Sequence, residues 1–98
     1  MKADQKWDDV RIRPSTLYRD LDGEGVLLQL DLGEYYTVEG VANHAWQLLA
    51  ASTLQQTFET LAREYEVERS ELAADLATFV GDLAGSHLID IVTPAGPG

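Results

Sequence analysis

Two hydrophobic periods divide the chain at about Gly40. Before this residue, apolar and polar positions alternate in short runs that turn residues separate, a pattern typical of antiparallel strands. After it, apolar residues recur every three or four positions, which is typical of amphipathic helices. The order of the two patterns predicts a small sheet followed by a helical part.

The alternating part, residues 10–38, predicts a three-stranded antiparallel meander. Alternation within 17–21 and within 26–30 marks two strands, and the aromatic and β-branched run 34–38 marks a third. The Asp22-Gly23 pair is a strong turn signal between the first two strands. We interpret the glycines of this segment as hairpin glycines, namely Gly23, Gly25 and Gly33.

Three helices are predicted after Gly40, and Gly85 is expected to end the last of them. Ser52 with Gln55, or Thr53 with Gln56, forms a capping box at the start of the second helix. Trp46 is expected on the shoulder of the first helix, and the apolar run 88–92 is consistent with a returning strand. The predicted apolar stripes are Val41, Ala45, Leu48 and Leu49; then Leu54, Phe58, Leu61, Ala62 and Tyr65; then Leu72, Leu76, Phe79, Val80 and Leu83.

Length and composition fit one compact domain. The 98 residues are 45% hydrophobic and 24% charged, which is ordinary globular composition. We expect residues 10–92 to form the domain, 1–9 a flexible arm and 93–98 a flexible tail. The predicted fold class is α+β, with a three-stranded antiparallel sheet followed by three helices, an order similar to a winged helix-turn-helix.

The charge distribution argues against the partner that a winged helix usually binds. The formal net charge is −10, and from Asp20 onward fourteen acids face only Arg63 and Arg69. Such a surface repels phosphate and anionic lipid, so we expect neither nucleic acid nor a membrane as partner. A neutral or basic partner fits better, and a winged-helix DNA-binding regulator is kept as an alternative that topology alone supports.

Residues that carry enzymatic or metal chemistry are scarce. The chain has no cysteine, and its two histidines, His44 and His87, are interpreted as surface or boundary residues without a metal. There is no nucleophile elbow, Gly-rich phosphate loop, secretory signal or long apolar run. We therefore predict a cytoplasmic binding protein, without catalytic residues or a cofactor.

The third predicted strand, Glu34 to Val38, is a candidate open edge beside the helices. An open edge offers backbone groups to an incoming strand, and a neighbouring helix forms a groove for that strand's alternate side chains. The sequence thus favours recognition of an extended peptide by β-augmentation.

The run Val26-Leu-Leu-Gln-Leu-Asp-Leu-Gly-Glu-Tyr-Tyr-Thr-Val38, followed by Ala45-Trp-Gln-Leu-Leu49, resembles the PqqD-like family of recognition elements for ribosomally made, modified peptides. The run Leu61-Ala-Arg-Glu-Tyr65, with segments 74–76 and 79–83, adds to the resemblance, which covers about residues 10–92. The nearest likeness is to the standalone leader-binding half of a split lasso-peptide B protein. The chain departs from the family pattern at Glu39 and Ala42, where Asn and often Gly are usual.

The resemblance implies a non-catalytic adaptor that binds the leader region of a precursor peptide. The leader would add as an antiparallel strand to the third strand and be presented to a separate enzyme. In the lasso branch this enzyme is a transglutaminase-like cysteine protease that removes the leader. The alternative within the resemblance is a PqqD-type chaperone for a radical SAM enzyme in cofactor or peptide modification.

The family's binding positions carry over onto one strand edge and one helix. Glu34 to Val38 would supply the pairing edge, and Leu28 and Leu30 would line the base of the cleft if their face is inward. The alternative for Tyr36, Val38 and Phe79 is a purely structural place in the core. The complete predicted peptide-binding set is Leu28, Leu30, Glu34, Tyr35, Tyr36, Thr37, Val38, Asp75, Thr78, Phe79 and Asp82.

Overall fold

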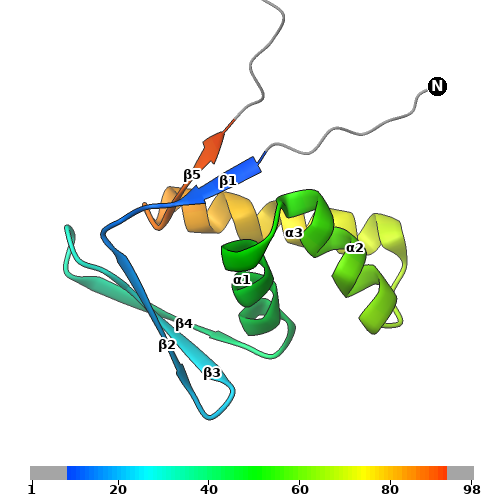
Figure 1. Ribbon diagram of the computed structural model, residues 1–98, viewed down its shortest axis with the longest axis horizontal. Helices are drawn as coiled ribbons and strands as arrows, with labels where there is room; N and C mark the ends of the chain where they lie inside the picture. The colour runs from blue at the N-terminus through cyan, green and yellow to red at the C-terminus, as the bar shows by residue number, and fades with distance from the viewer. Residues whose placement is uncertain (1–8, 93–98) are drawn as a thin grey trace, which may run out of the picture.

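The computed structural model describes residues 9–92, which form five strands and three helices (Figure 1). The predicted tail, and the predicted arm apart from Asp9, lie outside the described residues. No helix within residues 9–92 is long and apolar enough to span a membrane. The elements are β1 (Asp9–Ile12), β2 (Thr16–Leu21), β3 (Glu24–Gln29), β4 (Glu34–Glu39), α1 (Val41–Ala51), α2 (Leu54–Glu64), α3 (Arg69–Gly85) and β5 (Ile89–Val92).

The main sheet is the predicted antiparallel meander, in the order β2-β3-β4. Asp22 and Gly23 both have positive φ, 58° and 86°, as a two-residue type I′ hairpin turn requires. Gly33 also has a positive φ, 68°, between β3 and β4. The α+β class and the order of sheet and helices are confirmed, whereas the likeness to a winged helix-turn-helix stays a prediction.

A second, two-stranded sheet joins β1 to β5 near the two ends of the described chain. Its register pairs Asp9 with Val92 and Ile12 with Ile89. Arg13, the residue after β1, forms an ion pair of 3.0 Å with Asp90 of β5. The predicted returning strand is therefore confirmed. Asp9, which the sequence analysis assigned to the arm, is the first residue of β1, and its strand partner lies too far along the chain to leave a local signal.

Thr53, rather than Ser52, caps α2. The Gln56 amide donates to Thr53 Oγ1 at 3.1 Å, and the Thr53 amide donates to Gln56 Oε1 at 3.0 Å, which completes the capping box. Ser52 instead donates from its hydroxyl to the Leu48 carbonyl at 2.7 Å. One of the two capping alternatives is thus realised.

Replacing Thr53 by Ala is expected to lower the free energy of unfolding by about 1 kcal/mol, because the Gln56 amide loses its acceptor. Urea titration of the variant beside the wild type measures this difference. Ser52→Ala is the matched control and should cost less, since its hydroxyl bonds a carbonyl within α1. Equal costs for the two substitutions would contradict the cap assignment.

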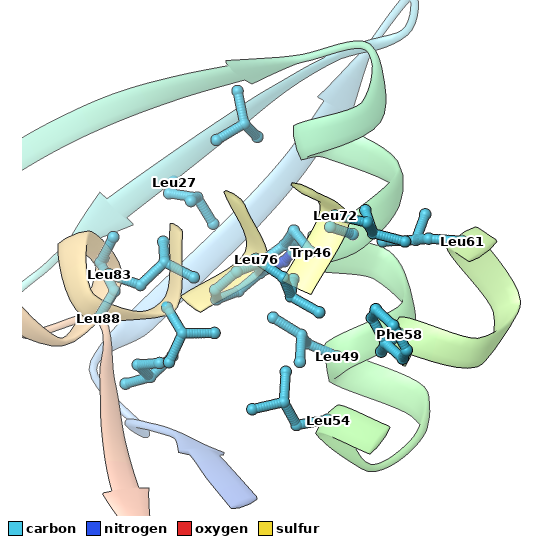
Figure 2. Close-up of a cluster of buried hydrophobic side chains, with 14 residues drawn as sticks. Leu27, Trp46, Leu49, Leu54, Phe58, Leu61, Leu72, Leu76, Leu83 and Leu88 are labelled. Atoms are coloured by element: carbon cyan, nitrogen blue, oxygen red, sulfur yellow. The ribbon is translucent and has the colours of Figure 1, made fainter. Parts of the chain in front are cut away.

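The helices bury one face of the main sheet in a single core. Trp46 is 2% exposed and lies in the middle of the core, beside Leu76 and between Leu27 and Leu49 (Figure 2). Trp46 was expected on the shoulder of the apolar face of this helix, and the shoulder is itself buried because the inner face of the sheet covers that side of α1. The predicted stripes of α2 and α3 are confirmed, with Leu54, Phe58, Leu61, Leu72, Leu76, Val80 and Leu83 buried.

A polar network ties the β2–β3 hairpin to α1. The buried Asn43 accepts a hydrogen bond from the Tyr18 hydroxyl at 2.6 Å and donates to the Gly23 carbonyl at 2.9 Å. Gly25 lies within β3 under this network and is not a hairpin glycine, which corrects the prediction. A Cβ there would lie 2.7 Å from Tyr18 Cε1 and 2.8 Å from Val38 Cγ2, so close packing requires the glycine.

Candidate functional site: the β4 edge and the α1–α3 groove

Strand β4 has an open edge, because β3 pairs with it on one side and no described strand pairs with the other. In an antiparallel pair, opposite residues alternate between those that exchange hydrogen bonds and those that do not. Leu21 and Glu24 close the two-residue turn and are a hydrogen-bonded pair. The bond from the Leu30 amide to the Ser15 carbonyl, 2.9 Å, has the same phase.

This phase determines which β4 residues face the open edge. In β3, the backbone groups of Glu24 and every second residue after it point to β2, so those of Gly25, Leu27 and Gln29 point to β4. Their partners are Val38, Tyr36 and Glu34. The amides and carbonyls that point outward are therefore those of the alternate residues, Tyr35, Thr37 and Glu39.

An apolar groove of about 230 Å³ opens between the start of α1, the inner side of α2 and the first two thirds of α3. It begins at Val41, two residues after the end of β4, where Gly40 turns the chain with φ 59°. Asp75 is the one charged residue of the lining. The groove is lined by Val41, Ala42, Ala45, Leu61, Leu72, Asp75, Leu76 and Phe79.

Helix α3 runs antiparallel to β4 on the inner side of the sheet. Its first half meets Val41, just past the end of β4, and the Ser86 side chain after its last turn is close enough to Tyr36 to affect that phenol. Tyr36 also donates to Glu34 Oε1 at 2.8 Å. The hydrogen bond to Glu34 raises the pKa of Tyr36, Ser86 acts in the opposite direction, and the phenol is neutral at physiological pH.

The two tyrosines of β4 point to opposite faces, as the alternation of a strand predicts. Tyr35 is 70% exposed on the outer face, whereas Tyr36 is half-buried against the core. Val38 is a buried core residue, so the structural alternative holds for its side chain, although its backbone is part of the strand. Glu34 and Thr37 are exposed.

The four predicted residues of α3 divide into two pairs. Asp75 and Phe79 line the groove. Phe79 also packs against the core, which confirms its structural role, whereas its contact with a ligand stays a prediction. Thr78 and Asp82 are exposed on α3 and are not part of the lining.

Leu28 does not face inward, and Leu30 is not part of the groove lining. Leu28 pairs with Tyr35 on the outer face, and Leu30 lies past the end of β3 and is exposed. The inner face of β3 carries Leu27 and Gln29, both fully buried. Leu28 and Leu30 were placed in the cleft on the condition that their face is inward, and this condition is not met. Alternation alone did not reveal which face was inner, because three leucines in 27–30 make both faces apolar.

Most of the groove lining was predicted as core rather than as a site. Val41 and Ala45 belong to the predicted stripe of α1, and Leu72 and Leu76 to that of α3. A helical period shows that residues share a face, but not where two such faces fail to close on each other. The groove differs from the core in the exposure of part of its lining, namely Val41 and Asp75, while Ala42 and Phe79 are partly buried.

The surroundings of the site are acidic. Glu34, Glu39, Asp75 and Asp82 are all exposed on the elements that flank it. Arg69 at the start of α3 is held by Glu59, 3.1 Å away, and lies 4.8 Å above the Phe58 ring. The field at the site therefore favours a neutral or basic ligand.

Neither histidine is part of a metal centre in the described structure. His44 Nδ1 lies 3.1 Å from the Tyr65 hydroxyl and 3.6 Å from Glu64, and His87 is exposed with φ 63° after α3. No group of three His, Cys, Asp or Glu side chains within residues 9–92 is arranged to hold a metal ion.

Comparison with known proteins gives one family and two solved structures. The family described as Coenzyme PQQ synthesis protein D (PqqD) matches residues 24–89. TbiB1, solved in complex with the TbiA(beta) leader peptide, is 28% identical, with a TM-score of 0.79 over 82% of this chain and 94% of that one. A lasso peptide synthetase B1 complexed with the leader peptide is 30% identical, with a TM-score of 0.74 over 83% of this chain and 96% of that one. No curated protein matches significantly.

The family match spans about two thirds of the chain and includes β3, β4, all three helices and the first residue of β5. It therefore contains both the open edge and the groove. The departures at Glu39 and Ala42 flank Gly40, and the turn there still brings α1 back against the sheet. The chain belongs to the PqqD family.

Proposed function

We propose that this chain is a non-catalytic adaptor that binds the leader segment of a ribosomally made precursor peptide and presents it to a separate maturation enzyme. The observation that carries the proposal is the open edge of β4 next to an apolar groove. The similarity to two proteins solved with leader peptides supports the choice of ligand.

The leader is proposed to add to β4 as an antiparallel strand. The outward amides and carbonyls of Tyr35, Thr37 and Glu39 are the groups available for this pairing. Each new hydrogen bond contributes about 0.5–1.5 kcal/mol net, whereas one fully buried apolar side chain contributes about 1.5–3 kcal/mol. A single apolar or aromatic leader residue in the groove thus contributes about as much as two backbone bonds.

The acidic flanks supply the remaining selectivity in this proposal. Asp75 at the groove would attract a basic or hydroxyl-bearing leader residue, and Phe79 beside it would pack against the apolar anchor. Asp82 and Thr78 lie further along the exposed side of α3 and would contact the leader only at the rim. A net charge of −10 draws a basic leader towards the site from a distance.

The enzyme partner is proposed to be a transglutaminase-like leader protease acting in the cytoplasm. Both similar solved structures, TbiB1 and a lasso peptide synthetase B1, are complexes with a leader peptide, which supports the lasso branch. The family description instead favours a PqqD-type partner of a radical SAM enzyme as the second candidate. The neighbouring reading frames discriminate the two: a protease and a cyclase indicate lasso maturation, and a radical enzyme indicates the alternative.

A fluorescent leader peptide from the adjacent precursor gene, titrated into the purified chain, tests the proposal directly. We expect saturable binding in about the micromolar range or tighter, as strand addition with one apolar anchor provides. Truncating the leader should abolish the signal. A leader that does not bind, alone or with the maturation enzyme present, would refute the adaptor function.

Replacing Asp75 by Asn is expected to weaken binding of a basic leader about threefold, because one charge–charge contact at an exposed site contributes little. Raising the salt concentration should shrink the difference between variant and wild type. Glu66→Gln, an equal charge change in the α2–α3 connection, is the matched control and should leave the affinity unchanged. The two titrations, each at low and high salt, measure both effects.

A further inference from the structure

The outer face of the main sheet carries an apolar row that crosses all three strands. The register places Leu17, Leu28 and Tyr35 side by side on this face. Leu17 is 51% exposed and Tyr35 70% exposed, and Leu28 between them is half-buried. The helices lie on the other side of the sheet (Figure 1), so nothing in residues 9–92 covers the row.

The same face ends in a pair of like charges. Glu24 and Glu39 are directly opposite each other on β3 and β4, and both are exposed. Like charges at such a cross-strand position repel each other. Neither carboxylate forms an ion pair within the described residues. Arg19, the one base on this face, lies on β2 between the level of the apolar row and the level of Glu24. A Lys or Arg from outside the chain would relieve the repulsion.

These observations identify what can cover the face. A second copy of this chain would bring its own excess of acids, with a net charge of −10, against Glu24 and Glu39. A protein surface with apolar side chains and a basic rim complements both the row and the carboxylate pair. The outer face is also continuous with the edge of β4, so a strand added there would extend it beside Tyr35.

We propose that this outer face docks the maturation enzyme, through an apolar and basic surface of that enzyme. The inference rests on the proposed leader-binding function. The added leader strand and the row would form one surface, so an enzyme bound there contacts adaptor and leader together and binds the loaded adaptor more tightly than the empty one. The groove and the docking face then lie on opposite sides of the same sheet.

Leu17→Glu separates the two activities, because Leu17 lies on β2, the strand furthest from the leader edge. Val67→Glu is the matched control, since Val67 is 46% exposed in the α2–α3 connection. The probe is the purified maturation enzyme that the neighbouring reading frames identify, immobilised and titrated with wild type and variants, each with and without leader. Fluorescence anisotropy of the labelled leader gives leader affinity independently.

We expect Leu17→Glu to weaken binding to the maturation enzyme about fivefold or more, with leader affinity unchanged within about twofold. Glu24→Gln should weaken docking less and reduce its salt dependence, and Val67→Glu should change neither affinity. Unchanged docking of Leu17→Glu, or no docking of the loaded wild type, would overturn the inference while leader binding stands. Failure of the leader to bind would instead refute the proposed function, and docking of the unloaded chain would still report on the face.

Self-association is measured on the same samples by analytical ultracentrifugation. A monomeric wild type is expected. A wild-type dimer that Leu17→Glu converts to a monomer would show that a second copy covers the face, which would also overturn the inference.

Discussion

Thr37→Pro is expected to weaken leader binding at least about tenfold while the chain keeps its fold. The Thr37 amide points to the open edge of β4, so proline removes a donor that the leader would use and none that β3 uses. One lost hydrogen bond accounts for about 0.5–1.5 kcal/mol, and the proline ring also blocks close approach of a new strand. Titration of a fluorescent leader peptide measures the effect.

The phase of the β3–β4 ladder supplies the controls. Thr37→Val keeps the amide and the shape of the side chain and should bind the leader as tightly as the wild type. Tyr36→Pro removes an amide that faces β3, so it should lower the thermal midpoint, whereas Thr37→Pro should lower it far less. A folded Thr37→Pro variant with wild-type affinity would exclude strand addition at this edge.

A second test leaves the protein unchanged and alters the peptide. Leader peptides carrying a single backbone N-methyl group at successive positions should lose affinity at every second position, because only alternate leader amides would face β4. A leader bound as a helix, or through side chains alone, would not show this alternation. The result therefore remains informative even if the proline variant is unstable.

The sequence predicts the elements of this fold better than their long-range pairings. Alternation and turn residues located β2, β3 and β4 because each hairpin is closed by adjacent residues such as Asp22 and Gly23. The pairing of β1 with β5 was not predicted, because the two strands lie at opposite ends of the described chain and no turn between them marks the pair. The placement of Gly25 likewise depends on Tyr18 and Val38, which approach it from two neighbouring strands.

The strand edge of the candidate site was predictable, because the alternation of residues along the backbone is enough to locate a strand. The run 34–38 was expected to be an open edge, and the sheet order confirms that β4 lies at an edge. The side chains were harder, because the face of a strand is determined by what packs on it: Leu27 is buried and Leu28 is not, although both are leucine. Of the groove lining, only Asp75 and Phe79 were predicted as site residues, because most of the others belong to helix stripes that face the core.

Filling the groove should have the largest effect on leader affinity. Ala42→Phe places an aromatic ring from the start of α1 into the space between Val41 and Phe79. The ring would occupy the volume that an apolar leader residue needs, and displacing one such buried side chain costs about 1.5–3 kcal/mol, or about ten- to a hundredfold in affinity.

Ala42→Phe should lower leader affinity without lowering the stability of the free chain. Comparing the two quantities distinguishes a blocked groove from an unfolded variant. The new ring packs against the apolar lining of the groove, so the free energy of unfolding should be unchanged or slightly higher. Ala50→Phe places the same residue on an exposed side of α1 and is the matched control, with wild-type affinity expected. A stable Ala42→Phe variant that binds the leader normally would show that the leader is recognised through the β4 edge without an anchor in the groove.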